Sequence, residues 1–294
     1  MTKRILLLLG AVATLAAFGA LAARGSASAH TTGAATAAAS CPTVHDGKLT
    51  IGTDNPAYPP WYAGGTKGGK WKINDPSTGK GYESAVAYAI AKRLGYGKSQ
   101  VKWTYVPFNK SFAPGTKSFD FDINQISITP ARAKVVSFSV SYYDVNQAIV
   151  VKKGTKIAGI RSIKGLRSFK LGAQLGTTSY AFIASRIKPS QTPSVPSSNA
   201  AAVALLKNKQ IDGLVVDLPT AFYVTAVQVP NSKILGQFEN TAGQATDHFG
   251  VVLQKGNPLT ACVNKAITTL RAGGTLKKLQ QTWLAKATGA PILK

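Results

Sequence analysis

Short apolar strands alternate with amphipathic helical segments through most of this 294-residue chain. Apolar residues recur at helical spacing in 82–94, 199–209 and 258–270, whereas 101–106 alternates as a half-buried strand. Strands that are followed by helices again and again favour a sheet covered by helices over a barrel or a helix bundle. The pattern therefore predicts the α/β class.

One expected strand, 121–128, ends in side chains suited to a small carboxylate. Ser127 and Thr129 close the strand, Pro130 stops it, and Arg132 follows. A guanidinium group offers a planar pair of donors that matches a carboxylate, and hydroxyl groups beside it can hold the rest of a ligand. This stretch is the first candidate for a binding site.

Two later strand ends carry further candidates. The strand at 170–173 runs through Gln174–Ser179 into a helix, which gathers backbone N–H groups and the positive end of a helix dipole at one place. Such a place suits an anion. Asp217 ends the strand at 211–216, where it fits either of two roles: cap of the next helix, or carboxylate facing a cleft.

The N-terminal region is typical of an export signal. Basic residues precede an apolar run over 5–23, and Ala27-Ser28-Ala29 supplies a small-residue cleavage site. We expect a signal peptide at 1–29 and a flexible tether at 30–46; a membrane anchor is the alternative for the apolar run. The protein is then exported to the periplasm or the outer face of the cell envelope, with about 250 residues left to fold.

The chain is strongly basic, with 35 Lys and Arg against 11 Asp and Glu and a formal charge of +24. Removal of the expected signal peptide would take away Lys3, Arg4 and Arg24, so the formal charge of the mature chain would be +21 (24 − 3). The bases are spread along the chain without a basic run or an RNA-binding signature, so no nucleic-acid partner is expected. A solvated surface that favours anionic cell-wall polymers or lipid headgroups fits better.

The two cysteines are Cys41 and Cys262. In an exported protein an even pair favours a disulfide, here between the start of the folded region and a segment near the C-terminus. A lipidated Cys41 is one alternative, although Ala38-Ala39-Ser40 is a poor lipid-attachment sequence. Two free buried thiols are the other.

The sequence lacks the groups that catalysis or metal binding would need. It has three histidines, two of them in or beside the tether, and no nucleophile elbow, phosphate-binding loop or His/Cys metal spacing. His248 follows Asp247, but a lone pair of this kind is more often packing than a catalytic base. We therefore expect a binding protein rather than an enzyme, with no cofactor and no metal.

A series of short motifs follows one order along the chain. They are Gly52-Thr53-Asp54, Ala57-Tyr58-Pro59-Pro60-Trp61, Gly81-Tyr82-Glu83, Thr129-Pro130-Ala131-Arg132, Gln174-Leu175-Gly176-Thr177-Thr178-Ser179, Val215-Val216-Asp217 and Gly274-Thr275-Leu276. Between about Lys48 and Leu284 the chain resembles the family 3 extracellular solute-binding proteins, the polar amino-acid receptors of ABC importers. It departs from the family at Asn124-Gln125-Ile126-Ser127 and in a longer first loop at Asn55-Pro56.

The resemblance implies the type II periplasmic binding protein fold. In this fold two α/β lobes are joined by two crossing strands, and the ligand lies in the cleft between them. The first lobe is then expected at 47–143 and 247–294, and the second at 144–246. Closure is expected on a hinge near 141–146 and 243–248.

The resemblance also implies how the two ends of an amino acid are held. Arg132 corresponds to the arginine that binds the ligand α-carboxylate, and Ser127 lies beside it. Thr177 and Thr178 correspond to helix-start contacts to the same carboxylate from the second lobe. Asp217 corresponds to the carboxylate that takes the α-ammonium group.

The ligand side chain is expected to lie between aromatic residues. Tyr58 corresponds to the covering aromatic, and Phe108 is expected opposite it, with Phe112 as the alternative. Four polar residues are expected to set specificity: Asp54, Glu83, Gln125 and Gln174.

We therefore expect the substrate-binding component of an amino-acid ABC importer, a monomer that delivers its ligand to the permease subunits. Asp54 and Glu83, without a spare base in the motifs, disfavour an acidic ligand and favour a neutral polar or cationic amino acid. Two other functions are kept as alternatives. One is an exported enzyme similar to cyclohexadienyl dehydratases with Glu83 as its acid, and the other is a receptor that signals to a membrane partner.

Overall fold

The computed structural model describes residues 41–45, 47–66, 68–239, 246–287 and 289–294. The expected signal peptide and the expected tether lie outside this part, except for tether residues 41–45. Among the described residues, no helix combines the length and the apolar character needed to cross a bilayer.

The first sheet contains β1 (Leu49–Thr53), β2 (Val101–Tyr105), β3 (Phe121–Asp122), β4 (Val136–Phe138) and β11 (Val252–Gln254), in the spatial order β2-β1-β3-β11-β4. β1 is parallel to β2 and β3, whereas β11 is antiparallel to β3 and β4. Parallel neighbours need a crossover connection, and helix α1 (Tyr82–Arg93) lies in the one between β1 and β2. The polar C-terminal ends of these parallel strands therefore share one edge of the sheet.

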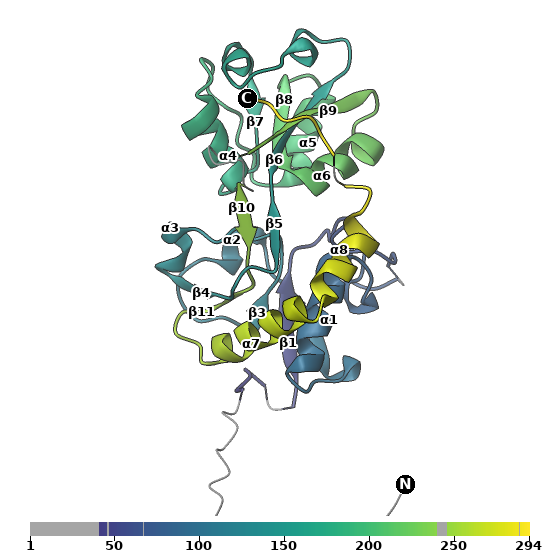
Figure 1. The fold of residues 1–294 in the computed structure, drawn as a ribbon, viewed down its shortest axis with the longest axis vertical. Coiled ribbons are helices and arrows are strands. Elements are labelled where there is room, and N and C mark those ends of the chain that lie inside the picture. The colour runs from purple at the N-terminus through teal and green to yellow at the C-terminus, as the bar shows by residue number, and fades with distance from the viewer. Residues whose placement is uncertain (1–40, 46, 67, 240–245, 288) are drawn as a thin grey trace, which may run out of the picture. The chain divides into compact units, whose positions relative to one another are not determined.

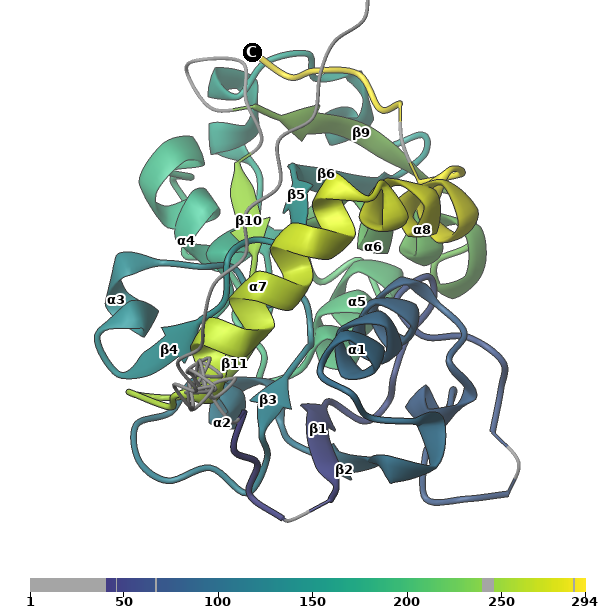
Figure 2. The same cartoon turned by 60° about the horizontal axis from the view of Figure 1, so that its bottom comes forward.

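Three helices pack together beside this sheet: α1, α7 (Leu259–Ala272) and α8 (Thr275–Leu284). Figure 2 shows α7 as the long helix that leads into α8, with α1 next to them. Ile90 and Ile267 are fully buried in the core cluster that includes Ile51. Complete burial of one such side chain is worth about 1.5–3 kcal/mol, so apolar packing holds these helices in place.

The second sheet contains β6 (Gln147–Lys152), β7 (Leu171–Gly172), β8 (Gly213–Asp217) and β9 (Ser232–Phe238), in the order β7-β8-β6-β9. Successive side chains of a strand face opposite sides, and both sides are apolar here. Ile149 packs with Phe182 of α4 (Thr178–Phe182) in one cluster. Val150 packs in another with residues of α5 (Asn199–Lys207) and α6 (Leu218–Tyr223).

Two antiparallel strands, β5 (Tyr143–Val145) and β10 (Asp247–Phe249), lie between the two larger sheets in Figure 1. The chain passes from the first sheet to the second through β5 and returns through β10. The α/β fold with two crossing strands is therefore confirmed. Residues 243–245, the first part of the second expected hinge segment, lie outside the described residues.

The C-terminal end differs from the expected arrangement, in which 247–294 belonged with the first sheet. Ile292 pairs with Gln237 of β9, and Leu293 is buried in the cluster around Phe238. The apolar side chain of Leu293 finds its partners on the second sheet, so the final residues pack there.

The strand expected over 121–128 is shorter than predicted, since β3 ends at Asp122. Gln125 has a left-handed backbone with φ of 48°, which is incompatible with a strand. After this turn Ser127 makes only an isolated bridge to Phe249, and the short helix α3 (Pro130–Ala133) begins.

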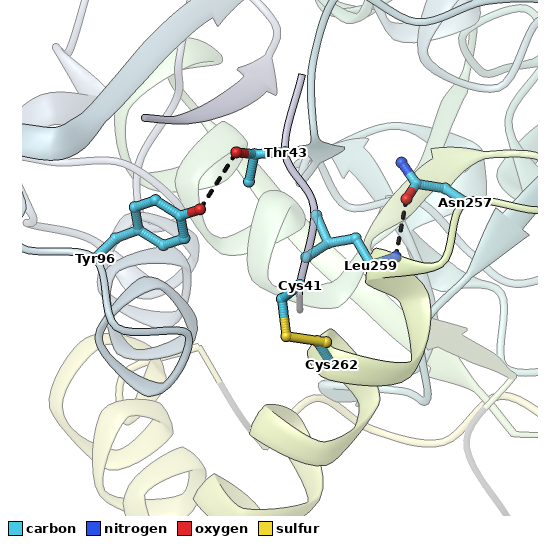
Figure 3. The surroundings of a disulfide bond; sticks show 6 residues. All are labelled: Cys41, Thr43, Tyr96, Asn257, Leu259 and Cys262. Carbon is cyan, nitrogen blue, oxygen red and sulfur yellow. Dashed lines mark hydrogen bonds between the residues drawn. A yellow bond between two sulfur atoms is a disulfide. The ribbon is translucent and has the colours of Figure 1, made fainter. Parts of the chain in front are cut away.

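A disulfide joins Cys41 to Cys262 of α7, as Figure 3 shows, which confirms the predicted pair. Near it, Thr43 Oγ1 and the Tyr96 hydroxyl lie 3.3 Å apart. The bond ties Cys41, the first described residue, to a cysteine of α7 that lies 221 positions later in the sequence.

Replacing both cysteines with serine is expected to lower the free energy of unfolding by about 2–5 kcal/mol, because the bond restricts the unfolded chain over a long loop. Chemical denaturation followed by circular dichroism measures the change. Reductant should lower the stability of the wild-type protein to the same value and leave the variant unaffected. Equal denaturation midpoints for the variant and the oxidised wild type would contradict the prediction.

Candidate functional site

A cavity of about 280 Å³ lies between the two larger sheets, a size suited to a small molecule. Ten of the eleven residues predicted to bind ligand line it, and Glu83 does not. Its walls come from residues 54–58, 61–62, 105, 107–109, 124–125, 127 and 132 on one side and 174, 177–179, 197–200, 215–217 and 220 on the other.

Arg132 enters the cavity from α3. Thr129 caps this short helix by accepting a hydrogen bond from the Arg132 N–H at 3.2 Å. The guanidinium group is almost buried, with 9% of the residue exposed, and it lies 4.2 Å from the ring centroid of Phe112 and 5.7 Å from that of Phe108. Burial lowers the pKa of Arg132 to about 10, so the side chain stays charged at neutral pH.

Arg132 also links the two sides of the cavity. Nη1 donates to the Ser127 carbonyl oxygen at 2.7 Å, and Nη2 donates to the Gly176 carbonyl oxygen at 2.8 Å. Gly176 has φ of 79°, and a Cβ there would lie 2.5 Å from Oδ1 of Asn109. Because Gly176 has no side chain, this loop beside the second sheet can approach Asn109 on the side of the first sheet.

The start of α4 faces Arg132 across the cavity. Thr177 caps the helix, since its Oγ1 accepts from the Tyr180 N–H at 3.2 Å. The N–H groups of the first turn have no carbonyl partner within the helix. Thr178 Oγ1 lies 3.2 Å from Ser127 Oγ, which adds a second contact between the two sides. The arrangement offers donors to an anion beside the guanidinium group.

Asp217 supplies a carboxylate at the end of β8. It occupies the cap position of α6, but its side chain makes no capping hydrogen bond. Oδ1 accepts from Gln147 Nε2 at 2.7 Å instead. Of the two roles expected for Asp217, the structure therefore favours the carboxylate that faces the cleft.

Gln147 organises the carboxylates around this point. Its Nε2 also donates to Asp247 Oδ2 at 2.6 Å, and its Oε1 accepts from the Ser179 hydroxyl at 2.6 Å. Burial, together with the neighbouring charge of Asp247, raises the pKa of Asp217 to about 8, although the hydrogen bond from Gln147 opposes the shift. With this pKa the Asp217 carboxyl is mostly protonated at neutral pH.

The loop after β1 forms the aromatic wall. Tyr58 packs 6.0 Å, between ring centroids, from Tyr223 of α6. Trp61 Nε1 donates to Thr220 Oγ1 at 3.1 Å, a further bond across the cavity. Asp54 lies at the start of this loop, and burial raises the pKa of its carboxyl. Phe108, on helix α2 (Phe108–Ser111), lines the cavity as predicted, whereas its alternative Phe112 packs behind it.

Glu83 was expected to face the ligand, but it lies behind the wall. Gly81 opens α1 with φ of 92°, and a Cβ at this position would lie 2.5 Å from the Trp61 carbonyl oxygen. This close approach turns Glu83 into the core, where its carboxylate accepts from the Gln125 N–H at 2.6 Å and from the Tyr142 hydroxyl.

Sequence reasoning missed Gln147 and Asp247 as site residues. Both are at least nine-tenths buried. The available signal was a glutamine directly before the apolar residues Ala148 to Val151, because a polar residue at the start of a buried strand needs partners.

The chain matches the family model for bacterial extracellular solute-binding proteins, family 3, over residues 49–286. It belongs to this family. Among curated members it is 25% identical over 257 residues to a probable histidine-binding protein of Neisseria gonorrhoeae, covering 85% of this chain and 88% of that one.

Solved structures of amino-acid-binding proteins have the same fold. An ancestral arginine-binding protein bound to arginine is 29% identical with a TM-score of 0.65, covering 81% of this chain and 98% of its own. An ancestral amino acid-binding protein described as a precursor of cyclohexadienyl dehydratase is 28% identical with a TM-score of 0.64, covering 81% of this chain and 95% of its own. The type II periplasmic binding fold, with its ligand cleft between two lobes, is therefore the fold of this family 3 protein.

Proposed function

We propose that this protein is the substrate-binding component of an amino-acid ABC importer. One observation carries the proposal: Arg132 from the side of the first sheet and Asp217 from the second sheet line one cavity of about 280 Å³. A zwitterion has a carboxylate for the guanidinium group and an ammonium group for the carboxylate. Such a ligand bridges the two sides.

The carboxylate end would take donors from both sides. The guanidinium group of Arg132 offers a planar fork, and the first turn of α4 at Thr177 and Thr178 offers backbone N–H groups and a hydroxyl. The ammonium end would displace the proton of Asp217. Because both ends are engaged only when the two sides are close, the ligand favours the closed state.

The rest of the cavity suits a polar side chain that is not acidic. Asp54 and Gln174 line it, and no Lys or Arg other than Arg132 does so among the described residues. Tyr58 and Phe108 supply flat apolar surfaces. We propose a neutral polar or cationic amino acid, a class that includes the ligands named for the relatives, such as arginine and histidine.

The lobes would follow the two larger sheets. We place the first at 47–143 and from 247 to the end of α8, and the second at 144–246 together with the final residues that pack on β9. Strands β5 and β10 would then carry the hinge.

Acting as a monomer outside the cytoplasm, the protein would release its ligand to the permease subunits. The position of Glu83 behind the wall supports binding over the dehydratase alternative.

A thermal-shift screen against the free amino acids tests the proposal. A ligand at a hundredfold excess over its Kd stabilises the folded state by about 2.7 kcal/mol, which corresponds to about 5 °C or more in Tm for a protein of this size. We expect such a shift from arginine, histidine or glutamine and none from aspartate or glutamate. No shift from any amino acid would overturn the proposal.

Affinity is expected to rise with pH up to about 8. Asp217 is mostly protonated in the ligand-free site because its pKa is about 8, and the ligand ammonium group lowers that pKa on binding. Binding therefore releases a proton, and affinity falls by up to tenfold for each pH unit below 8. Calorimetry at pH 7 in buffers of different ionisation enthalpy should show close to one proton released per ligand, and Asp217→Asn should show none.

We also propose that the surface associates with anionic bilayers. Among the described residues only Asp144 and Asp212 are exposed acids, and the one ion pair is between His248 and Asp144. Helix α7, to which the disulfide ties Cys41, packs with α1 and α8, and these three helices have no exposed acid. They carry six exposed bases: Lys92, Arg93, Lys265, Arg271, Lys277 and Lys278. This cationic face would attract anionic headgroups.

Cosedimentation with phosphatidylglycerol vesicles measures this association. We expect binding at low ionic strength that is lost at about 1 M salt, where charges are screened beyond about 3 Å. Reversal of Lys277 and Lys278 to glutamate should weaken binding more than reversal of Lys207 and Lys209. Equal effects of the two pairs would show that the cationic face is not the contact.

A further inference from the structure

Glu83 holds one residue of the cavity wall from behind. The residue is fully buried, with 0% exposed. Its Oε1 accepts from the Gln125 backbone N–H at 2.6 Å and from the Tyr142 hydroxyl, and its Oε2 accepts from the Gln125 side-chain amide. All three partners donate, so an ionised carboxylate satisfies every one of them.

Gln125 is a residue that needs such support. Its φ of 48° lies in the left-handed region, which side chains other than that of glycine rarely adopt. Two hydrogen bonds to one carboxylate fix both its backbone and its side chain. Asn124 and Gln125 both line the cavity, so the position of this turn decides the shape of the wall there.

We propose that Glu83 is a positioning residue for ligand selection: it holds the left-handed turn at Gln125 and so sets the wall that faces the ligand side chain. The proposal rests on the proposed function of the cavity, and it gives Glu83 no contact with the ligand. The turn at Gln125 and the buried carboxylate form one unit, contributed by α1 and by the segment after β3.

The charge on Glu83 provides an independent readout. Burial raises the pKa of Glu83 to about 7, while the hydrogen bonds from Tyr142 and Gln125 oppose the shift. The other titratable groups that interact with it are Tyr62, Tyr82, Asp122, Tyr142 and Asp217, and no Lys or Arg among the described residues is hydrogen-bonded to it. The amide proton of Gln125 should therefore report the ionisation of Glu83.

The test is a double-mutant cycle of Glu83→Gln and Gln125→Gly, read by calorimetry with L-arginine, or with L-glutamine if arginine does not bind. Glycine adopts the left-handed turn without an anchor. Glu83→Gln should weaken binding by about tenfold in the wild-type background, since a charge-assisted bond is lost, and by less than about threefold in the Gln125→Gly background. Asp120→Asn is the matched control, because Asp120 is equally buried and accepts from two backbone N–H groups, of Val44 and Thr50, away from the cavity.

Nuclear magnetic resonance of the ligand-free protein makes the test independent of the ligand. The Gln125 amide resonance should move with pH around a midpoint near 7 in the wild type and in Asp120→Asn, and stay fixed in Glu83→Gln. A Gln125 resonance that moves with pH in Glu83→Gln as it does in the wild type, or equal losses of affinity in both backgrounds, would overturn the positioning role. Failure of the wild type to bind any amino acid would instead overturn the proposed function. The pH titration of the Gln125 amide resonance would then still test the role of Glu83.

Discussion

Replacing Arg132 with alanine is expected to weaken amino-acid binding by about a hundredfold or more. The substitution removes the fork for the ligand carboxylate and the bond from Nη2 to the Gly176 carbonyl oxygen across the cavity. Loss of one partner from a buried charge pair costs about 3–5 kcal/mol, and each 1.4 kcal/mol is about tenfold in Kd. Isothermal titration calorimetry measures the change.

Two further variants separate the geometry of the fork from its charge. Arg132→Lys keeps the charge without the planar fork and should bind with intermediate affinity. Lys134→Ala removes an exposed base that does not line the cavity, and it should bind as the wild type does. If folded Arg132→Ala binds with near-native affinity, the carboxylate end of the proposed site is wrong.

Replacing Asp217 with asparagine is the second large effect expected. Asparagine keeps the acceptor for Gln147 Nε2, but it removes the charge that pairs with the ammonium group. We expect affinity to fall by about 2–4 kcal/mol, or about thirtyfold to several hundredfold. Asp212→Asn is the control, since Asp212 is an exposed acid outside the cavity.

The same substitution should not destabilise the ligand-free protein at high pH. The pKa of Asp217 in the folded state is raised to about 8, so the folded state binds this proton more tightly than the unfolded state does. The contribution of Asp217 to stability is therefore largest at low pH and is lost as the pH rises towards 8. At about pH 9, Asp217→Asn should unfold at or above the wild-type temperature; a clear loss of stability there would mean that Asp217 serves the fold.

Local sequence patterns were sufficient to predict much of this fold. The helix at Tyr82–Arg93 begins directly after Gly81, and Val86 and Ile90 of its predicted apolar face are buried. The other members of that face are only partly buried, because the buried face is turned towards Ala87 and Ala91. The motifs around Arg132, Thr177 and Asp217 mark strand ends and helix starts, so their meeting at one cavity follows from the fold. The disulfide between Cys41 and Cys262 could be predicted from the even number of cysteines and the expected export of the protein.

The features that sequence did not predict depend on contacts between distant residues. The strand that begins at Phe121 ends at Asp122, before a left-handed turn at Gln125 that is held by a carboxylate 42 residues earlier. Asp217 fits the pattern of a helix cap, but Gln147, 70 residues away, takes its carboxylate instead. No local pattern contains these partners, because Gln147 and Asp217 become neighbours only when β6 pairs with β8, and Glu83 meets Gln125 only when α1 packs beside the segment after β3.

In the proposed binding mode, one cavity holds both ends of an amino acid. Calorimetry that compares L-arginine with agmatine, which lacks the carboxylate, and with N-acetyl-L-arginine, which lacks the ammonium group, tests it most directly. We expect each analogue to bind at least about a hundredfold more weakly than arginine, because each leaves Arg132 or Asp217 without its partner. Binding of either analogue with the affinity of arginine would contradict the claim.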